Sequence, residues 1–188
     1  MDYLDHSDVK LLGVLVGEKT AQRLYQGSLV SLFATGSIGQ EMHPRIAAAR
    51  ELVKRVLKEE MKRGAMLSSP AAVREYLRLL LIGKEYEVFV VLFLDAQNRM
   101  IEAEELFRGT LTQTSVYPRE VVKRALYHNA GAVIFGHNHP SGVAEPSHAD
   151  EALTQALKQA LALVDVRVLD HFIVAGNGVM SFAERGSI

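Results

Sequence analysis

The chain has 188 residues, of which 48% are hydrophobic and 23% are charged, so it can bury a core as one compact domain with a smaller appendage. It contains no cysteine, which excludes a disulfide framework, a thiolate zinc finger and a cysteine nucleophile. The net charge of −1 gives no bulk attraction to nucleic acid, and no apolar run is long enough to span a membrane. The acidic N-terminus does not resemble a signal peptide, so we expect a soluble, cytoplasmic protein without a membrane partner.

The first third of the chain is predicted to be helical. Short helices are expected over 9–16 and 20–25, and Pro44 stands at the start of an amphipathic helix over 45–63. The apolar stripe of that helix contains Ile46, Ala49, Leu52, Val53, Val56 and Leu57. Ser68-Ser69-Pro70 indicates a boundary and the start of another helix that runs to about Ile82. We therefore divide the chain into a small helical region, 1–66, and a main domain, 67–188.

From Glu85 onward the pattern changes to alternating strands and helices. Val88 to Leu94 is a nearly unbroken β-branched and aromatic run, typical of a strand buried on both faces. Further strands are expected over 100–107, 109–116, 130–136, 166–175 and 179–182, and helices over 118–128 and 148–163. The last two strands flank Gly176-Asn-Gly178, which predicts a β-hairpin. The alternation of elements predicts a mixed α/β fold.

The segment that is most informative about chemistry runs from Phe135 to Asp150. His137 and His139 follow a predicted strand, and residues i and i+2 of an extended chain project to the same side, so both imidazoles can reach one ion. The ten residues between His139 and Asp150 allow a turn and the entry of a helix, which brings a carboxylate back toward the strand end. Two histidines and one carboxylate leave a fourth position for water, the open arrangement of catalytic zinc. Zinc would lower the pKa of that water toward about 7.

The same residues permit a simpler interpretation. Ser147 and Asp150 fit the Ser-x-x-acid capping box at a helix start, which is common and needs no metal. A bare His-x-His is equally unspecific. The joint spacing of His-x-His, seven residues, Ser, two residues and Asp is much rarer than either part, and it favours a metal site.

This spacing resembles the JAMM (MPN-type) metalloprotease motif, with Asn138 in place of the usual Ser or Thr between the histidines. The longer string from His137 to Gly142, His-Asn-His-Pro-Ser-Gly, resembles the RadC family, whose members characteristically carry that Asn. Three other segments carry the same resemblance: Val116-Tyr-Pro-Arg-Glu120, Leu169-Asp-His171 and Ser181-Phe-Ala-Glu-Arg-Gly186. The resemblance covers about residues 70–188 and is weaker over 1–66. It implies a cytidine-deaminase-like JAMM fold, a three-layer arrangement of a sheet with flanking helices.

The resemblance also implies roles for individual residues. His137, His139 and Asp150 match the family's ligands for one zinc ion per chain, and Ser147 matches the residue thought to steady the oxyanion. The upstream catalytic Glu matches Glu87, at the head of the strand Glu87-Val-Phe-Val-Val-Leu-Phe-Leu-Asp95, where it would act as general base. Glu85 lies two residues earlier on the same strand face and is the main competitor.

Two further histidines lie close to these residues in the sequence or in the motif. His148 follows Ser147 directly, and a surface position on the helix is the expected one. His171, on a late strand, is either a partner that hydrogen-bonds a ligand or a satisfied histidine of the core.

The helical region suggests a link to DNA. RadC proteins commonly begin with a region that resembles helix-hairpin-helix modules, which bind DNA through backbone amides. Here the hairpin is degenerate, because Ser37 replaces one glycine of the usual Gly-apolar-Gly and the stretch from Gln40 to Pro44 contains no lysine or arginine. A helical packing role is therefore expected for this region.

Three functions are compatible with the sequence. The first is a zinc-dependent hydrolase with metallopeptidase or isopeptidase chemistry, acting on a peptide or protein substrate. The second is a DNA-associated repair or recombination protein with metal-dependent nuclease activity, which the net charge does not support. The third is a non-catalytic MPN-type binding module. One ligand set favours amide hydrolysis, because phosphodiester cleavage often uses two metals.

Overall fold

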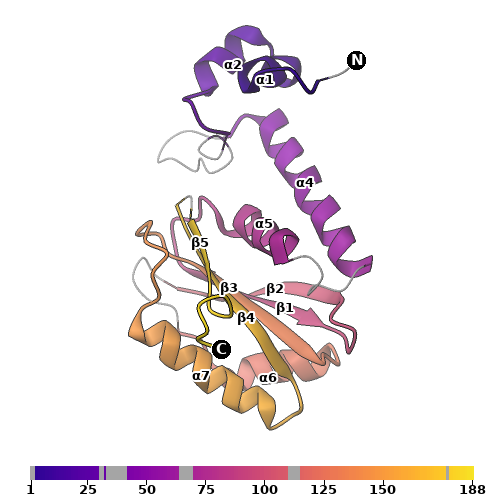
Figure 1. The fold of residues 1–188 in the computed structure, drawn as a ribbon, viewed down its shortest axis with the longest axis vertical. Coiled ribbons are helices and arrows are strands. Elements are labelled where there is room, and N and C mark those ends of the chain that lie inside the picture. The colour runs from indigo at the N-terminus through magenta and orange to yellow at the C-terminus, as the bar shows by residue number, and fades with distance from the viewer. Residues whose placement is uncertain (1–2, 30–31, 33–41, 64–69, 110–114, 177) are drawn as a thin grey trace.

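The computed structural model describes residues 3–29, 32, 42–63, 70–109, 115–176 and 178–188. Within these residues five strands form one mixed sheet of order β2-β1-β3-β4-β5 (Figure 1). The strands are β1 (Val88–Leu94), β2 (Met100–Arg108), β3 (Ala132–Asn138), β4 (Arg167–Ala175) and β5 (Gly178–Ser181). Helix α5 (Pro70–Leu81) covers one face, and α6 (Pro118–Tyr127) and α7 (His148–Ala162) cover the other. The three-layer, mixed α/β prediction is confirmed.

The central strand β1 is apolar on both sides because it separates two cores. All seven of its residues are buried. Val88, Val90, Leu92 and Leu94 pack toward α5, whereas Phe89, Val91 and Phe93 pack toward α6 and α7. Each fully buried side chain of this size contributes roughly 1.5–3 kcal/mol to stability. This two-sided burial explains the continuous apolar run in the sequence, and it makes β1 a rigid support for the residues directly before and after it.

Strand β3 pairs antiparallel with β1 and parallel with β4, and helix α7 forms the connection between β3 and β4. The loop after β3 leads to the first turn of α7, where Asp150 Oδ1 lies 3.3 Å from His137 Nε2 of β3. In the β1–β3 pair, Phe89 lies opposite His137. The head of β1, the end of β3 and the first turn of α7 are therefore neighbours.

The helical region contains α1 (Asp8–Val16), α2 (Glu18–Leu24) and α4 (Pro44–Arg63). The start of α4 packs with α1 and α2 around a small core formed by Leu12, Val16, Ala21, Leu32 and Ile46. Its far end contributes Leu57 and Met61 to the core beneath α5, and Lys58 Nζ lies 2.6 Å from Glu102 Oε1 of β2. Helix α4 thus joins the two parts of the described chain (Figure 1).

The structure corrects the predicted stripe of α4. Leu52, Val53 and Val56 are 63%, 51% and 55% exposed instead of facing a core. The reason is that the two ends of α4 pack against different cores and its middle spans the distance between them.

Most other predicted elements have the expected type, with ends shifted by up to two residues. Strand β3 runs to Asn138, so His137 belongs to the strand and does not follow it. The strand expected over 109–116 falls largely on 110–114, outside the described residues, and its described ends are not in a strand. Strands β4 and β5 form the predicted antiparallel hairpin. No helix in the described part of the chain combines the length and apolar character needed to cross a bilayer.

Candidate metal centre

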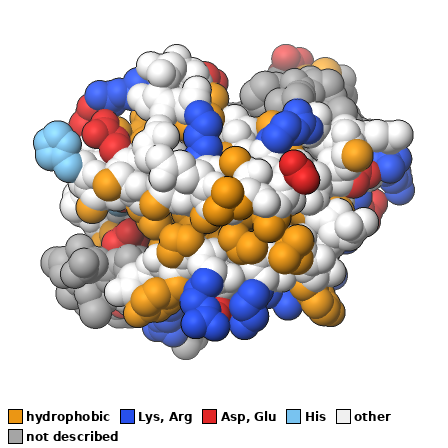
Figure 2. Space-filling model, turned by 90° about the horizontal axis from the view of Figure 1, so that it is seen from below, with side chains coloured by type: hydrophobic (Ala, Val, Ile, Leu, Met, Phe, Trp, Pro, Cys, Tyr) orange, Lys and Arg blue, Asp and Glu red, His pale blue; other side chains and the backbone are white. Residues whose placement is uncertain are grey.

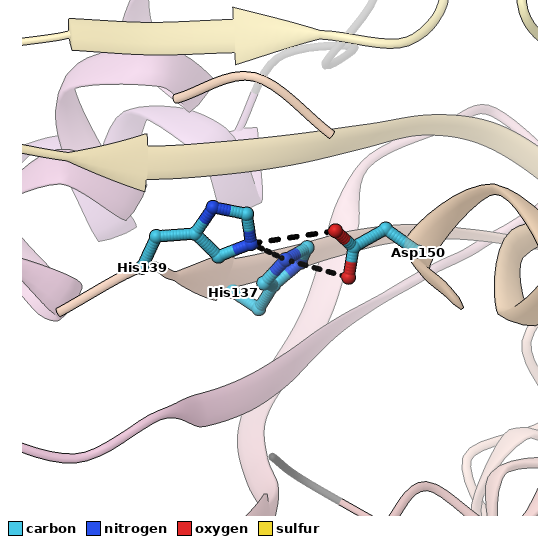
Figure 3. Close-up of side chains that lie close together, drawn as sticks. All are labelled: His137, His139 and Asp150. Atoms are coloured by element: carbon cyan, nitrogen blue, oxygen red, sulfur yellow. Dashed lines mark hydrogen bonds and ion pairs between the residues drawn. The ribbon is translucent and has the colours of Figure 1, made fainter. Parts of the chain in front are cut away.

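The side chains of His137, His139 and Asp150 converge on one point (Figure 3). His137 lies in β3, His139 directly follows that strand, and Asp150 lies in the first turn of α7. His137 Nε2 is 3.3 Å from Asp150 Oδ1, His139 Nε2 is 3.4 Å from Asp150 Oδ2, and the two Nε2 atoms are 2.9 Å apart. One ligand atom from each residue lies within 4.8 Å of the others, and among the described residues these three form the group that could hold a metal ion.

The donor set fits a small tetrahedral metal. Zinc binds His nitrogen and carboxylate oxygen at about 2.1 Å, which places tetrahedral ligand atoms about 3.4 Å from one another. The two histidine–aspartate distances of 3.3 and 3.4 Å, one to each carboxylate oxygen, are close to this spacing, and the 2.9 Å between the two Nε2 atoms is shorter than it. Two neutral imidazoles and one carboxylate would also leave a fourth position open toward the cavity described below.

The proton on His139 is held on the ring nitrogen that faces away from this point. His139 Nδ1 lies 2.8 Å from the carbonyl oxygen of Val143. A carbonyl oxygen only accepts hydrogen bonds, so Nδ1 carries the proton and, in the neutral ring, Nε2 has a free lone pair. The loop after β3 therefore sets the tautomer that a metal ligand needs.

A buried chain of hydrogen bonds does the same for His137. The Thr154 hydroxyl donates to the Asp150 carbonyl oxygen at 2.6 Å, so its oxygen accepts from His171 Nδ1 at 2.7 Å. His171 Nε2 then accepts from His137 Nδ1 at 2.8 Å, and His137 Nε2 is left with its lone pair. Burial also lowers the pKa of His171 well below its usual value, which keeps this ring neutral.

Both interpretations of His171 hold, because it is fully buried and bonds a candidate ligand. Thr154 is a residue of the site that sequence reasoning missed. Its spacing of four from Asp150, on the same face of one helix, is the signal that could have found it.

Ser147 and Asp150 form the capping box, and Asp150 also faces the two histidines. Asp150 Oδ2 accepts from the backbone N–H of Ser147 at 2.7 Å and from its hydroxyl at 2.6 Å, and the Asp150 N–H donates to Ser147 Oγ. Burial opposes ionisation of Asp150, but in the metal-free site the facing His137 and His139 rings, each of which donates from Nε2 when it carries a second proton, outweigh it and hold the pKa of this carboxyl well below its usual range. The cap thus aims an ionised carboxylate at the histidines.

A cavity of about 710 Å³ opens above the three residues. Glu87 and Ser147 line it, together with the apolar side chains of Phe89, Tyr117, Val143 and Leu153. Its wall therefore combines segments that lie far apart in the sequence, and the side chains of Tyr117 and Val143 were not themselves predicted to line it.

The structure separates the two candidate glutamates. Glu87 is half-buried and lines the cavity, whereas Glu85 is exposed and is absent from its lining. The hydrogen bond to Asp150 raises the pKa of His139, and the charge of Glu87 acts in the same direction. His148 is on the surface, as expected, with Nδ1 3.6 Å from Glu151 Oε2.

The fold and the three converging side chains define a JAB-type domain with a candidate metal centre. A family model described as the RadC-like JAB domain matches residues 67–187. The chain therefore belongs to the RadC family, whose JAB/MPN domain class includes metal-dependent hydrolases.

Curated relatives show the same membership. A UPF0758 protein of Nitrosomonas eutropha is 61% identical over 170 residues, which is 86% of this chain and 76% of that protein. A UPF0758 protein of Thiobacillus denitrificans is 64% identical over 151 residues, 80% of this chain and 67% of the relative. One from a Janthinobacterium species is 59% identical over 165 residues, 88% of this chain and 74% of the relative. The names of these relatives state no activity.

Proposed function

We propose that this chain is a zinc-dependent hydrolase that cleaves amide bonds, as a metallopeptidase or isopeptidase. The observation that carries the proposal is the convergence of His137 Nε2, His139 Nε2 and an Asp150 carboxylate oxygen at the floor of a cavity that Glu87 also lines. The donor set supports zinc as the metal, because imidazole nitrogen suits zinc better than magnesium or calcium. A bound zinc would supply a Lewis acid that polarises a carbonyl oxygen and makes water acidic at neutral pH.

The side chains around the centre would then divide the proton transfers between them. Glu87 takes a proton from a water molecule in the cavity and passes it to the nitrogen of the leaving amine. The Ser147 hydroxyl donates a hydrogen bond to Asp150 Oδ2 at 2.6 Å. Rotation of this hydroxyl would direct the same hydrogen toward an oxyanion. Asp150 and the two histidines hold the metal.

The surroundings of the cavity favour a polypeptide substrate. Tyr117 precedes α6 and is 57% exposed, and Val143 in the loop after β3 is 59% exposed, so apolar side chains stand at the cavity wall in contact with solvent. Figure 2, a view onto α6 and α7, shows a band of hydrophobic side chains with Lys and Arg side chains beside it. The apolar wall of the cavity suits apolar side chains of a peptide, whereas a phosphodiester backbone needs cations, and the described residues that line the cavity include no Lys or Arg. One candidate ligand group occurs among the described residues, and two-metal chemistry needs two.

An activity screen tests this proposal. The zinc-loaded protein is assayed against quenched-fluorescent linear peptides, isopeptide-linked peptides and, in parallel, plasmid DNA. We expect amide cleavage that Glu87→Gln lowers by about 100-fold or more, because the general base is lost while the side-chain volume is kept. Glu85→Gln is the matched control and should keep wild-type activity.

Two results would contradict the proposal. Cleavage of DNA without cleavage of any amide would favour the nuclease alternative. Equal losses in Glu87→Gln and Glu85→Gln would remove Glu87 from its role. The cytoplasmic location and the use of zinc in the cell stay predictions.

A further inference from the structure

Asn138, the residue between the two histidines, bonds the segment that precedes β1. It is the last residue of β3 and is 4% exposed. Its Oδ1 accepts from the backbone N–H of Val88 at 2.8 Å, and its Nδ2 donates to the carbonyl oxygens of Tyr86 at 3.0 Å and Lys84 at 3.4 Å. Successive side chains of a strand point to opposite faces, so this amide lies on the other side of β3 from the His137 ring.

These bonds enclose one residue. The Tyr86 carbonyl and the Val88 N–H are the backbone groups on either side of Glu87, and both bond the Asn138 side chain. From the other direction, the Gly109 N–H donates to the Glu87 carbonyl oxygen at 2.8 Å. The backbone of Glu87 is therefore held between Asn138 of β3 and the residue after β2, while its side chain lines the cavity.

We propose that Asn138 is a positioning residue that fixes Glu87 relative to the metal centre. The inference rests on the proposed function, because positioning Glu87 matters only if Glu87 is the general base. One residue then connects the two parts of the site. The backbone of Asn138 links His137 to His139, and its side-chain amide holds the backbone on both sides of Glu87.

The chemistry of the amide explains why asparagine suits this position. The segment offers one N–H donor and two carbonyl acceptors, so the bonding group must accept at one atom and donate at another about 2.3 Å away, as a primary amide does. A serine hydroxyl is shorter and has one hydrogen. An aspartate has the same shape, but its second oxygen would face the carbonyl oxygens of Tyr86 and Lys84, which repel it.

Amide hydrogen exchange of the metal-free protein tests the contact directly. In Asn138→Ser and Asn138→Ala, which lack an acceptor that reaches the Val88 N–H, we expect the Val88 amide to exchange roughly tenfold faster or more, the change that the loss of one net hydrogen bond produces. Asp95→Ala is the matched control: Asp95 accepts from the backbone N–H groups of Gln97 and Arg99 at the opposite end of β1. Its loss should loosen that turn and leave Val88 unchanged.

Cobalt(II) binding tests the consequence for Glu87. When the spectra are compared at a single fixed pH, cobalt(II)-loaded Asn138→Ser should show the wild-type ligand-field spectrum, because no ligand is changed. His139→Ala should lose that spectrum. The pH dependence of that spectrum should shift in Asn138→Ser in the same direction as in Glu87→Gln.

Each result separates the possible explanations. Unchanged exchange at Val88 in both Asn138 variants would overturn the proposal. Faster exchange throughout the sheet would also overturn it, because Asn138 would then support only the fold. Local loosening at Val88 with a wild-type pH dependence of the cobalt spectrum would remove the link to Glu87. A wild-type protein that binds no metal would contradict the proposed function instead, and the exchange data would still decide whether Asn138 holds the segment.

Discussion

At the scale of single residues, the site depends on which nitrogen of each histidine carries its proton. His139 is fixed by one backbone carbonyl, that of Val143, and His137 by the side chains of His171 and Thr154. Groups that hold ligand histidines in this way typically change metal affinity by about 10- to 100-fold when they are removed. The candidate centre therefore extends beyond its three ligands.

The Thr154 hydroxyl provides a test of this hydrogen-bond chain. Thr154→Val keeps the shape of the side chain and removes the atom that accepts from His171, so His171 loses its fixed tautomer. We expect zinc affinity, measured by competition with a chromophoric chelator, to fall by about 10- to 100-fold.

Ser181→Ala is the control for that measurement. Ser181 is also buried, but its hydroxyl donates to Asp170 and not to a histidine. It should lower stability and leave zinc affinity near the wild-type value. An equal loss of affinity in both variants would show that Thr154 acts through general stability alone.

At the scale of secondary-structure elements, β2 and α6 are joined by a charged group. Glu104 of β2 accepts from Arg124 of α6, and His128 at the end of that helix lies 2.8 Å from the same carboxylate. The hydrogen bond from Arg124 outweighs the effect of burial and, with that from His128, lowers the pKa of Glu104 below 4.5. The carboxylate is thus stabilised in its ionised form by folding.

The pH dependence of stability follows from this shift. Because the folded pKa of Glu104 lies below the unfolded value of 4.5, its contribution is complete above pH 4.5 and is lost as the pH falls through the folded pKa. Urea unfolding midpoints should therefore show wild type more stable than Glu104→Gln above pH 4.5, and the difference should shrink below it. A difference that grows on acidification would contradict this assignment.

The elements also show what sequence patterns can and cannot reveal. The run from Val88 to Leu94 predicted a doubly buried strand because burial on both faces requires apolar residues at every position. The stripe of α4 was wrong at Leu52, Val53 and Val56, because periodicity shows that a helix has an apolar side and not how far the partner extends along it.

At the scale of the whole molecule, the crossover from β3 through α7 to β4 is what assembles the site. The convergence of His137, His139 and Asp150 could be predicted, because the three residues fall within one short motif that this crossover folds back on itself. Glu87 required the family resemblance, since it directly precedes β1, about fifty residues before His137, and β-strand pairing is nonlocal.

The hydrogen-bond partners of His171 and Asn138 could not be predicted in the same way. His171 and Asn138 reach their partners through tertiary contacts between strands and helices, which leave no periodic signal in the sequence. Both are polar groups in a buried setting, where an unpaired atom is costly. Their burial alone would have pointed to partners, but only the packed sheet identifies them.

The central claim, that His137, His139 and Asp150 form a metal centre, is tested most directly by the metal content of the purified, untagged protein. Elemental analysis should find about one zinc per chain in the wild type, and none in His139→Ala or Asp150→Ala while both variants remain folded by circular dichroism. A wild-type protein that holds no zinc and takes up none when it is added would contradict the claim. Ser147 and Asp150 would then be a helix cap and nothing more.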